Sequence, residues 1–304
     1  LGEFNVNLLR LGDQNFPAVT MSDNGRIVFG WVGPDADQTG VYYRIMTTGQ
    51  VSTVEQPLSG YTLGNVYQGF GSGPASNSFV VAGTSGNDTF EFTGGPSSDR
   101  WVVKLNGNRI TVPAGVSSLV FEGQGGYDTV ILKGTAGDET LYRWPDRVIF
   151  EGATFSVTAN SVENATAYGQ GGNDIAYLYD SPGGDSLTAT ATYLVLSGSG
   201  FYSRAMDFRT IVAYSTGGSD VARFFGSAAA EEFLGTPSSA TLRGSNYERR
   251  AEGFATVSAY AGSNSDVAKL YDRTDSEDTL VATPTYAKLT GAGYSVQAVN
   301  FSKV

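Results

Sequence analysis

A turn motif that ends in aspartate recurs at a constant interval along the chain. Its four copies end in Asp128, Asp174, Asp220 and Asp266, and each of these aspartates is 46 residues from the next. A fixed period of this length is typical of repeat architectures, in which one supersecondary unit is used many times and buries its apolar face against its neighbours. The period therefore predicts that the larger, C-terminal part of the chain is an array of repeats.

The apolar positions of the unit keep the same period, with one additional residue in the last unit. Glycines, aromatic residues and a second apolar position recur as Gly152, Gly198, Gly244 and Gly291, as Phe155, Phe201, Tyr247 and Tyr294, and as Val162, Phe208, Phe254 and Phe301. The four units lie near 121–166, 167–212, 213–258 and 259–304. We expect the aromatic and apolar positions to be buried, and equivalent residues to form ladders along the axis of the stack.

The local chemistry of each unit indicates short β-strands joined by tight turns. Glycine accounts for 40 of the 304 residues, close to twice its usual share of about 7%. In the segment 175–179 the residues Ala176 and Leu178 share one face, while Tyr177 lies on the other face. Sustained helical periodicity is absent, so we expect about five strand pieces in each unit and little helix. The predicted fold is all-β, a parallel β-solenoid (β-helix) with about two coils per unit, and the alternative is a β-propeller.

The composition excludes several classes of function. The chain has no cysteine and no histidine, which rules out disulfides, zinc sites with Cys or His ligands, and catalysis through a Ser-His or Cys-His pair. No convincing catalytic constellation is present, and we do not expect an enzyme. With 19 basic against 30 acidic residues the formal net charge is −11, so a nucleic-acid partner is not expected. No apolar run reaches the roughly 20 residues of a transmembrane helix, so no membrane span is expected.

Residues 1–70 follow a different pattern and are expected to form a separate β region. An Asp-Asn-Gly turn at 23–25 separates two apolar segments, which is a strong hairpin signal, and a third strand is expected at 41–45. The segment 69–77 is rich in glycine and serine and predicts a linker before the repeat region at 78–304. Because the sequence opens without an initiator methionine or a signal peptide, we expect it to be a segment cut from a longer chain.

The N-terminal region resembles a repeat of very large bacterial extracellular and adhesin-like proteins. The residues that carry this resemblance are Gly2-Glu3-Phe4-Asn5-Val6-Asn7, Pro17-Ala18-Val19, Gly25, Trp31 and Gly40-Val41-Tyr42-Tyr43-Arg44. The resemblance implies a secreted or cell-surface location.

The turns of residues 83–304 resemble haemolysin-type calcium-binding repeats, through the segments 86–90 and 171–175. That family repeats about every nine residues, so that successive turns enclose calcium, whereas the unit of this chain has 46 residues. The resemblance implies an extracellular solenoid and makes calcium the cofactor to consider.

Acidic residues at the turns are the candidate metal ligands. Calcium takes roughly six to eight oxygen ligands, and carboxylates recur in this chain beside glycine-rich backbone that can turn its carbonyls inward. The candidates are Asp128, Asp174, Asp180, Asp185, Asp220 and Asp266. The alternative is that each carboxylate accepts hydrogen bonds from backbone N–H groups of its turn.

A segment that departs from the repeat supplies the candidate binding residues. The segment 143–147 breaks the repeat where the other units carry small Thr and Ala, and its residues Arg143, Trp144 and Arg147, together with Tyr177, are candidates for contact with a polysaccharide. The alternative is that this segment is a capping difference in the first full unit and that the aromatic residues stack on one another.

Three functions remain open at this point. The regularity of the units favours a structural, adhesive or assembly segment of a large secreted or cell-surface protein, with cell-surface components, a polysaccharide or copies of itself as partners. The alternatives are a calcium-dependent carbohydrate-binding module and a carbohydrate-active enzyme on a β-helix. Such an enzyme needs two carboxylates that face each other, and the neighbours Glu231 and Glu232 are expected to point in opposite directions.

Overall fold

The computed structural model describes the strands between residues 15 and 57, and then residues 78–274 and 277–304. These parts of the chain contain no α-helix, and their one 3₁₀ helix, η1, spans Ser98–Arg100. Nothing helical there has the length and the apolar character that crossing a membrane requires. The prediction of an all-β protein with little helix is confirmed.

Five strands form an antiparallel sheet in the N-terminal region. Their bounds are β1 Asn15–Met21, β2 Ile27–Gly33, β3 Gly40–Thr47, β4 Gln50–Val51 and β5 Gln56–Pro57. β1 pairs with β2, and β2 pairs with β3, as the sequence predicts. The Asp-Asn-Gly turn itself and the predicted linker 69–77 lie outside the described residues.

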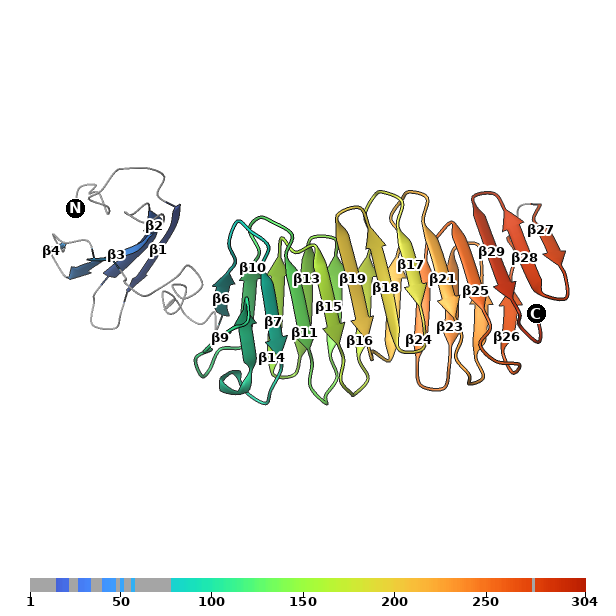
Figure 1. Cartoon of the computed structure of the whole chain (residues 1–304), viewed down its shortest axis with the longest axis horizontal. Helices are drawn as coiled ribbons and strands as arrows, with labels where there is room; N and C mark the ends of the chain where they lie inside the picture. The colour runs from blue at the N-terminus through green and yellow to red at the C-terminus, as the bar shows by residue number, and fades with distance from the viewer. Residues whose placement is uncertain are drawn as a thin grey trace.

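The other strands form two large sheets, whose strands follow one another along a single long axis from β6 to β27 (Figure 1). The 11-stranded sheet contains, in spatial order, β26 (Val267–Leu270), β22 (Glu232–Gly235), β23 (Ser239–Arg243), β24 (Glu248–Glu252), β20 (Thr210–Tyr214), β16 (Ile175–Tyr179), β12 (Thr140–Trp144), β13 (Arg147–Gly152), β14 (Phe155–Asn160), β10 (Ser118–Glu122) and β6 (Ser78–Ala82). The 13-stranded sheet contains β27 (Thr279–Ala282), β28 (Tyr286–Gly291), β29 (Tyr294–Val299), β25 (Thr256–Tyr260), β21 (Val221–Phe225), β17 (Ser186–Ala189), β18 (Tyr193–Gly198), β19 (Phe201–Met206), β15 (Asn164–Tyr168), β11 (Thr129–Lys133), β7 (Thr89–Thr93), β8 (Val102–Leu105) and β9 (Asn108–Ile110). Buried residues from both sheets belong to one core cluster.

The chain builds this stack by crossing from one sheet to the other and back. In the second unit β15 lies in the 13-stranded sheet, β16 lies in the 11-stranded sheet, and β17, β18 and β19 form an antiparallel meander in the 13-stranded sheet. The next unit starts with β20 in the 11-stranded sheet, where it pairs in parallel with β16. The fold is a β-solenoid of about six turns, as the sequence predicts, and not a propeller.

One coil of the solenoid takes the chain once through both sheets. Each unit contributes strands to the two sheets in three successive passes, each through one sheet, so it makes one and a half coils and not the two that the sequence predicts. Because three is odd, equivalent residues of successive units fall in opposite sheets. Asp128 precedes β11 in the 13-stranded sheet, whereas Asp174 precedes β16 in the 11-stranded sheet. The prediction of one ladder for each repeat position is therefore wrong. Parallel neighbours along one sheet are instead 35 to 40 residues apart, and the interval is 35 in the register of Tyr142 with Tyr177 and of Tyr177 with Val212.

Alternation along each strand fills the space between the two sheets. In β16 the side chains of Ala176 and Leu178 are fully buried, while Tyr177 is half-buried on the outer face. Arg223 and Lys269, the repeat equivalents of Tyr177, are exposed. The assignment of inner and outer faces from the sequence is confirmed.

Six of the eight predicted core residues are buried. Those that are buried are Phe155, Phe201, Tyr294, Val162, Phe208 and Phe254. Tyr247 and Phe301 are partly buried and pack against the same cluster. Since burying one large apolar side chain contributes roughly 1.5–3 kcal/mol, these repeat positions supply much of the stability of the stack.

The pattern changes at the last strand of the 13-stranded sheet. Leu280 in β27 is 60% exposed, although its repeat equivalents Leu141, Leu187 and Phe233 are buried. β27 is the edge of its sheet in the described structure and has a neighbour on one side, β28. A repeat position is thus buried when a coil packs on each side of it, as expected for a solenoid.

The repeated glycines make room for the repeated aromatic rings. In the meander of the second unit Gly198 is the register partner of Phe201, across the turn between β18 and β19. A Cβ atom at Gly198 would lie 2.6 Å from Cε1 of Phe201, and one at Gly244 would lie 2.3 Å from Cε1 of Tyr247. Neither glycine has a positive φ. At Gly198 the added atom would also lie 1.5 Å from Oδ1 of Asp185. The glycine is therefore required by the close packing of the ring and of this carboxylate, and not by the backbone conformation.

Candidate functional site

The turn aspartates are buried, and four of them join each coil to the preceding one. The six predicted metal ligands are all at most 5% exposed, and they are Asp128, Asp174, Asp180, Asp185, Asp220 and Asp266. Oδ1 of Asp174 accepts the backbone N–H of Glu139 at 2.7 Å, and Oδ1 of Asp266 accepts that of Glu231 at 2.9 Å. Asp128 and Asp220 accept N–H groups in the same way, from Asp88 and Asp185. The carboxylates therefore serve as backbone acceptors between coils, in addition to any role within their own turn.

Sequence reasoning missed the second acid of two of these pairs, Glu139 and Glu231. Glu139 precedes Asp174 by 35 residues, and Glu231 precedes Asp266 by the same interval. This interval equals the register spacing of the parallel strands that follow these acids, β12 with β16 and β22 with β26, so a search for acids at that spacing would have found the pairs.

The neighbours Glu231 and Glu232 do not form a facing pair of carboxylates. Glu231 is buried in its turn, where its carboxylate accepts the N–H of Ser227 at 3.0 Å. Glu232 lies on strand β22 and pairs with Lys269, the outer-face residue of β26. The two side chains are held by different partners, as the alternation along a strand predicts.

The turns at which the chain crosses from one sheet to the other, here called corners, differ in the pKa values of their carboxylates. Burial raises the pKa of Asp174 to about 6, and the charge of Glu139 adds to the effect. Burial also raises the pKa values of Asp128 and Asp180. At Asp266 burial acts in the same direction, but hydrogen bonds from backbone N–H groups outweigh it, so that the pKa is lowered. The turn of Asp266 is therefore well supplied with donors, whereas those of Asp128, Asp174 and Asp180 are not.

Three of the predicted ligands lie together at one corner. Asp180 follows β16, Asp185 precedes β17 and Asp220 precedes β21, and each offers a carboxylate oxygen within 4.8 Å of the other two. Oδ1 of Asp180 accepts the N–H and the hydroxyl of Thr216, at 2.8 Å and 2.7 Å. Oδ2 of Asp185 accepts the N–H and the hydroxyl of Ser181, at 3.1 Å and 2.8 Å. Within the described residues the other predicted ligands join no such group.

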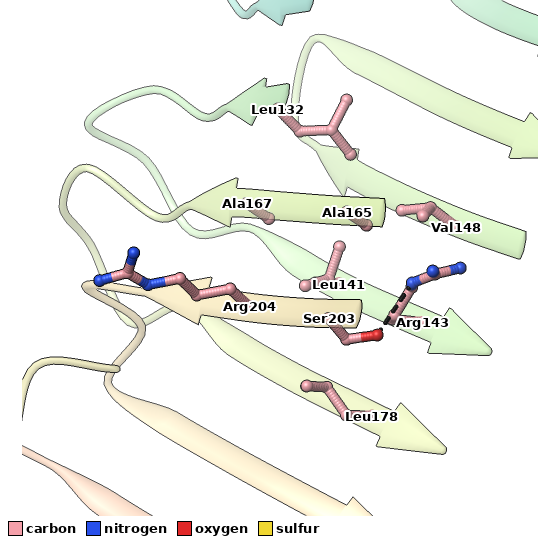
Figure 2. A pocket seen from close by; sticks show the side chains of 9 residues that line it. All are labelled: Leu132, Leu141, Arg143, Val148, Ala165, Ala167, Leu178, Ser203 and Arg204. Atoms are coloured by element: carbon pink, nitrogen blue, oxygen red, sulfur yellow. Dashed lines mark hydrogen bonds between the residues drawn. The ribbon is translucent and has the colours of Figure 1, made fainter. Parts of the chain in front are cut away.

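Arg143 belongs to the core and not to the surface. Its side chain is fully buried, and Nε of the guanidinium donates to Oγ of Ser203 at 3.0 Å (Figure 2). Nη2 donates to the carbonyl of Glu163, also at 3.0 Å. Burial lowers its pKa to about 10, which leaves it charged at neutral pH. The void beside it measures about 10 Å³, enough for about one water molecule. Arg143 is therefore not placed to contact a polysaccharide, because its donors are used inside the solenoid.

A second buried arginine, which sequence reasoning missed, has a similar role in the third unit. Arg249 is the repeat equivalent of Ser203 and is equally buried. It donates to the carbonyl oxygens of Thr190 at 3.0 Å, of Ala191 at 2.7 Å and of Arg209 at 3.2 Å. These donations satisfy backbone groups where the chain turns between strands and sheets.

Trp144, Tyr177 and Arg147 belong to a stacked ladder on the outer face of the 11-stranded sheet. The ring centroids of Tyr142 and Tyr177 are 5.3 Å apart, and those of Trp144 and Tyr179 are 5.2 Å apart with an interplanar angle of 5°. The guanidinium of Arg147 lies 5.7 Å from the centroid of the Trp144 ring. Stacking covers ring faces along the ladder, whereas a platform for a sugar needs an open face. The ladder therefore has the geometry of a structural element.

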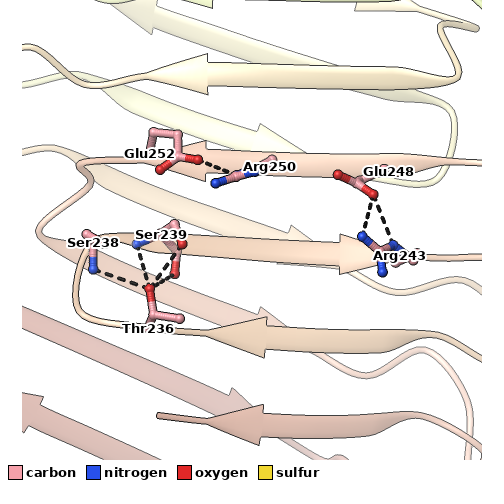
Figure 3. Close-up of polar contacts among 7 residues, drawn as sticks. All are labelled: Thr236, Ser238, Ser239, Arg243, Glu248, Arg250 and Glu252. Carbon is pink, nitrogen blue, oxygen red and sulfur yellow. Dashed lines mark hydrogen bonds and ion pairs between the residues drawn. The ribbon is translucent and has the colours of Figure 1, made fainter. Parts of the chain in front are cut away.

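A shallow groove of about 170 Å³ lies on the outer face of strands β22 to β24. Its charged side chains pair with acids on the same face, Arg243 with Glu248 at 2.7 Å and Arg250 with Glu252 (Figure 3). The groove is smaller than the roughly 300–1,000 Å³ of a typical ligand pocket, and its paired arginines carry no uncompensated charge toward a ligand.

The strand topology and these corners define the protein as a β-solenoid whose coils are joined by buried carboxylates. No family model matches the chain, and neither a curated protein nor a solved structure matches it. The class is thus assigned from the fold, and the two resemblances seen in the sequence stay predictions.

Proposed function

We propose that the chain is a structural segment of a secreted or cell-surface protein, in which the solenoid is a stiff scaffold for adhesion or assembly. The observation that carries the proposal is the continuous core, because one cluster of buried residues extends from Phe79 to Ala298. Each inner coil packs against a neighbour on both sides, so bending the stack would separate apolar surfaces.

The dimensions of the stack suit such a role. The two sheets contain 11 and 13 strands, and neighbouring strands are roughly 4.8 Å apart, which gives a length of roughly 50–60 Å along the axis. A rod of this length holds the groups attached at its ends at a fixed separation. The net charge of −11 favours solubility and disfavours adhesion to nucleic acid.

The geometry gives less support to the two alternatives, a calcium-dependent carbohydrate-binding module and a carbohydrate-active enzyme. The void at Arg143 and the groove over β22 to β24 are both smaller than an ordinary ligand pocket. The turn carboxylates accept hydrogen bonds from backbone groups, and the aromatic ladder covers its own ring faces. Scaffold, and not carbohydrate-active enzyme, is the function that we favour.

The proposal is tested by the location of the protein on its source cells and by the molecules that it binds. Antibodies raised against the full chain should label intact source cells, and brief external proteolysis should remove the label. Labelling that appears only after permeabilisation would exclude a surface role. Immobilised protein is then tested against cell-surface polysaccharides and against soluble copies of itself, with heat-unfolded protein as the control, and catalytic release of sugars would favour the enzyme.

A further inference from the structure

Three buried carboxylates at one corner of the solenoid lack a compensating positive charge. Asp180, Asp185 and Asp220 are 5%, 4% and 1% exposed, and they offer oxygens within 4.8 Å of one another. In the part of the chain that the structure describes, the ion pairs of lysine and arginine involve other acids. Three ionised carboxylates in a buried place are strongly unfavourable unless a cation neutralises them or some of them take up protons.

Two oxygens of this group also have no hydrogen-bond partner. They are Oδ2 of Asp180 and Oδ1 of Asp185, and both are inaccessible to solvent. The third residue is fully used, since Oδ1 of Asp220 accepts the N–H of Asp185 at 2.7 Å and Oδ2 accepts the hydroxyl of Ser215 at 2.6 Å. A buried oxygen without a donor is costly, and a metal ion is one group that satisfies such oxygens and cancels their charge together.

The third carboxylate stands at a repeat position that carries an acid in two units, as Asp180 and Asp272, and a glycine in the other two. Asp180 stands where the first and third units carry Gly134 and Gly226. Those two corners form the same turn with two acids each, so the fold does not require a carboxylate at this position. Oδ1 of Asp180 accepts hydrogen bonds from Thr216, but Oδ2 has no such partner among the described residues.

We propose that Asp180, Asp185 and Asp220 bind a calcium ion that fastens two neighbouring coils together. All the donors are carboxylate oxygens, and the chain has no histidine or cysteine, which favours a hard divalent cation over zinc or copper. Calcium takes its oxygens at roughly 2.3–2.6 Å, so its ligands lie at most about 5 Å apart, which the 4.8 Å limit of this group satisfies. Asp180 and Asp185 flank the turn 181–184, while Asp220 belongs to the next coil.

The proposal is narrower than a calcium ion at every repeated turn. Among the described residues one group of three acids is found, and it includes one of the four repeated aspartates, Asp220. The site also stands apart from the scaffold role, since a metal-free solenoid of the same shape would serve that role equally.

Thermal unfolding of the full chain tests the site. The protein is stripped with EDTA, dialysed and unfolded at constant ionic strength in calcium from zero to about 10 mM, above the roughly millimolar affinities of weak extracellular sites. Binding to the folded state raises the midpoint steadily with the logarithm of the calcium concentration once the site begins to fill. Magnesium should have a smaller effect, because it requires stricter octahedral geometry and gives up its water reluctantly. A midpoint that stays constant over this range, together with no heat of calcium binding in calorimetry, would overturn the proposal.

Matched variants locate the site. Asp180→Gly installs the residue of the first and third units and should abolish the calcium shift, and Asp180→Asn should weaken calcium affinity at least tenfold if the glycine variant does not fold. In EDTA Asp180→Asn should unfold at the same temperature as the wild type or higher, because one repelling charge is gone while an oxygen that can accept from Thr216 remains. Asp180→Gly loses that acceptor, so it is judged by its calcium shift alone. Glu151→Gln, at an exposed carboxylate, and Asp174→Asn, at a corner with two acids, should keep the full shift. Retention of the shift by both Asp180 variants, or its loss in Asp174→Asn alone, would place the ion elsewhere and refute the assignment.

Discussion

Replacement of Gly198 by alanine tests whether the repeated glycine exists to admit an aromatic ring. The new Cβ atom would lie 1.5 Å from Oδ1 of Asp185 and 2.6 Å from Cε1 of Phe201, well inside the roughly 3.5–4 Å at which such atoms pack. Both neighbours are buried, so neither can move into solvent without opening the corner. Overpacking a core costs about 1–3 kcal/mol, and with two contacts violated at once we expect about 3 kcal/mol.

Gly217→Ala is the matched control, because it adds the same methyl group in the neighbouring coil. There the new Cβ atom would meet nothing within 4 Å, and the backbone φ is one that alanine adopts. We expect this change to be neutral or to stabilise the protein by up to about 1 kcal/mol, since alanine restricts the unfolded chain. Urea unfolding followed by circular dichroism measures both variants, with the m-values compared as a check. Equal free energies of unfolding for the two variants would refute the argument that ring packing selects the glycine.

Three further substitutions test other parts of the account. Phe208→Ala should lower the free energy of unfolding by about 3–5 kcal/mol through the cavity it leaves, whereas the same change at Phe225, exposed on the outer face, should cost about 1 kcal/mol; equal losses would contradict the assignment of the core. Asp174→Asn should remove a pH dependence of the free energy of unfolding, because the pKa of Asp174 in the folded protein, about 6, lies above the ordinary value of 3.8. As the pH rises between these values the unfolded carboxyl loses its proton while the folded one keeps it, so wild-type stability should fall by on the order of 2–3 kcal/mol and stay low above pH 6. Urea titrations near pH 4 and pH 7.5 measure this, and parallel profiles for wild type and variant would contradict it. Arg143→Ala should cost about 3 kcal/mol, because it leaves the carbonyl of Glu163 without its donor and opens a cavity; a fully stable variant with altered polysaccharide binding would restore Arg143 as a surface residue.

The stacking of the units was predictable from the sequence, but the number of coils in each unit was not. A hairpin turn within one sheet and a corner between the two sheets both use glycine and small polar residues, as at 152–154 and 134–138. Turn chemistry alone therefore does not say where the chain changes sheet. The distinguishing signal is the interval between coils, which Glu139 and Asp174 carry and which the stronger 46-residue period conceals.

The candidate site was predictable in its residue types but not in its assembly. Asp180, Asp185 and Asp220 meet because the coil of Asp220 lies directly beside the preceding coil, and that register is a property of the stack. Arg143 was expected to contact a ligand because its segment departs from the repeat. Its burial depends on Ser203, which lies 60 residues further along the chain and supplies both the space and a hydroxyl acceptor.

The most direct test of the central claim is the distance between two repeat-equivalent outer positions. The chain has no cysteine, so spin labels can be attached to the pair Arg223→Cys and Lys269→Cys, and to the control pair Leu234→Cys and Lys269→Cys. Leu234 and Lys269 are register partners on neighbouring strands, so their labels should show strong dipolar broadening at a backbone spacing of roughly 4.8 Å.

Arg223 and Lys269 are 46 residues apart and lie on the outer faces of opposite sheets. Because the sheets are roughly 10 Å apart and the labels point away from each other, electron paramagnetic resonance should give a separation above about 20 Å. A unit of two whole coils would instead place these residues on one face, two strands and roughly 10 Å apart. Broadening in the Arg223–Lys269 pair would therefore contradict a unit of one and a half coils, and a long, unbroadened distance is the result that the structure predicts.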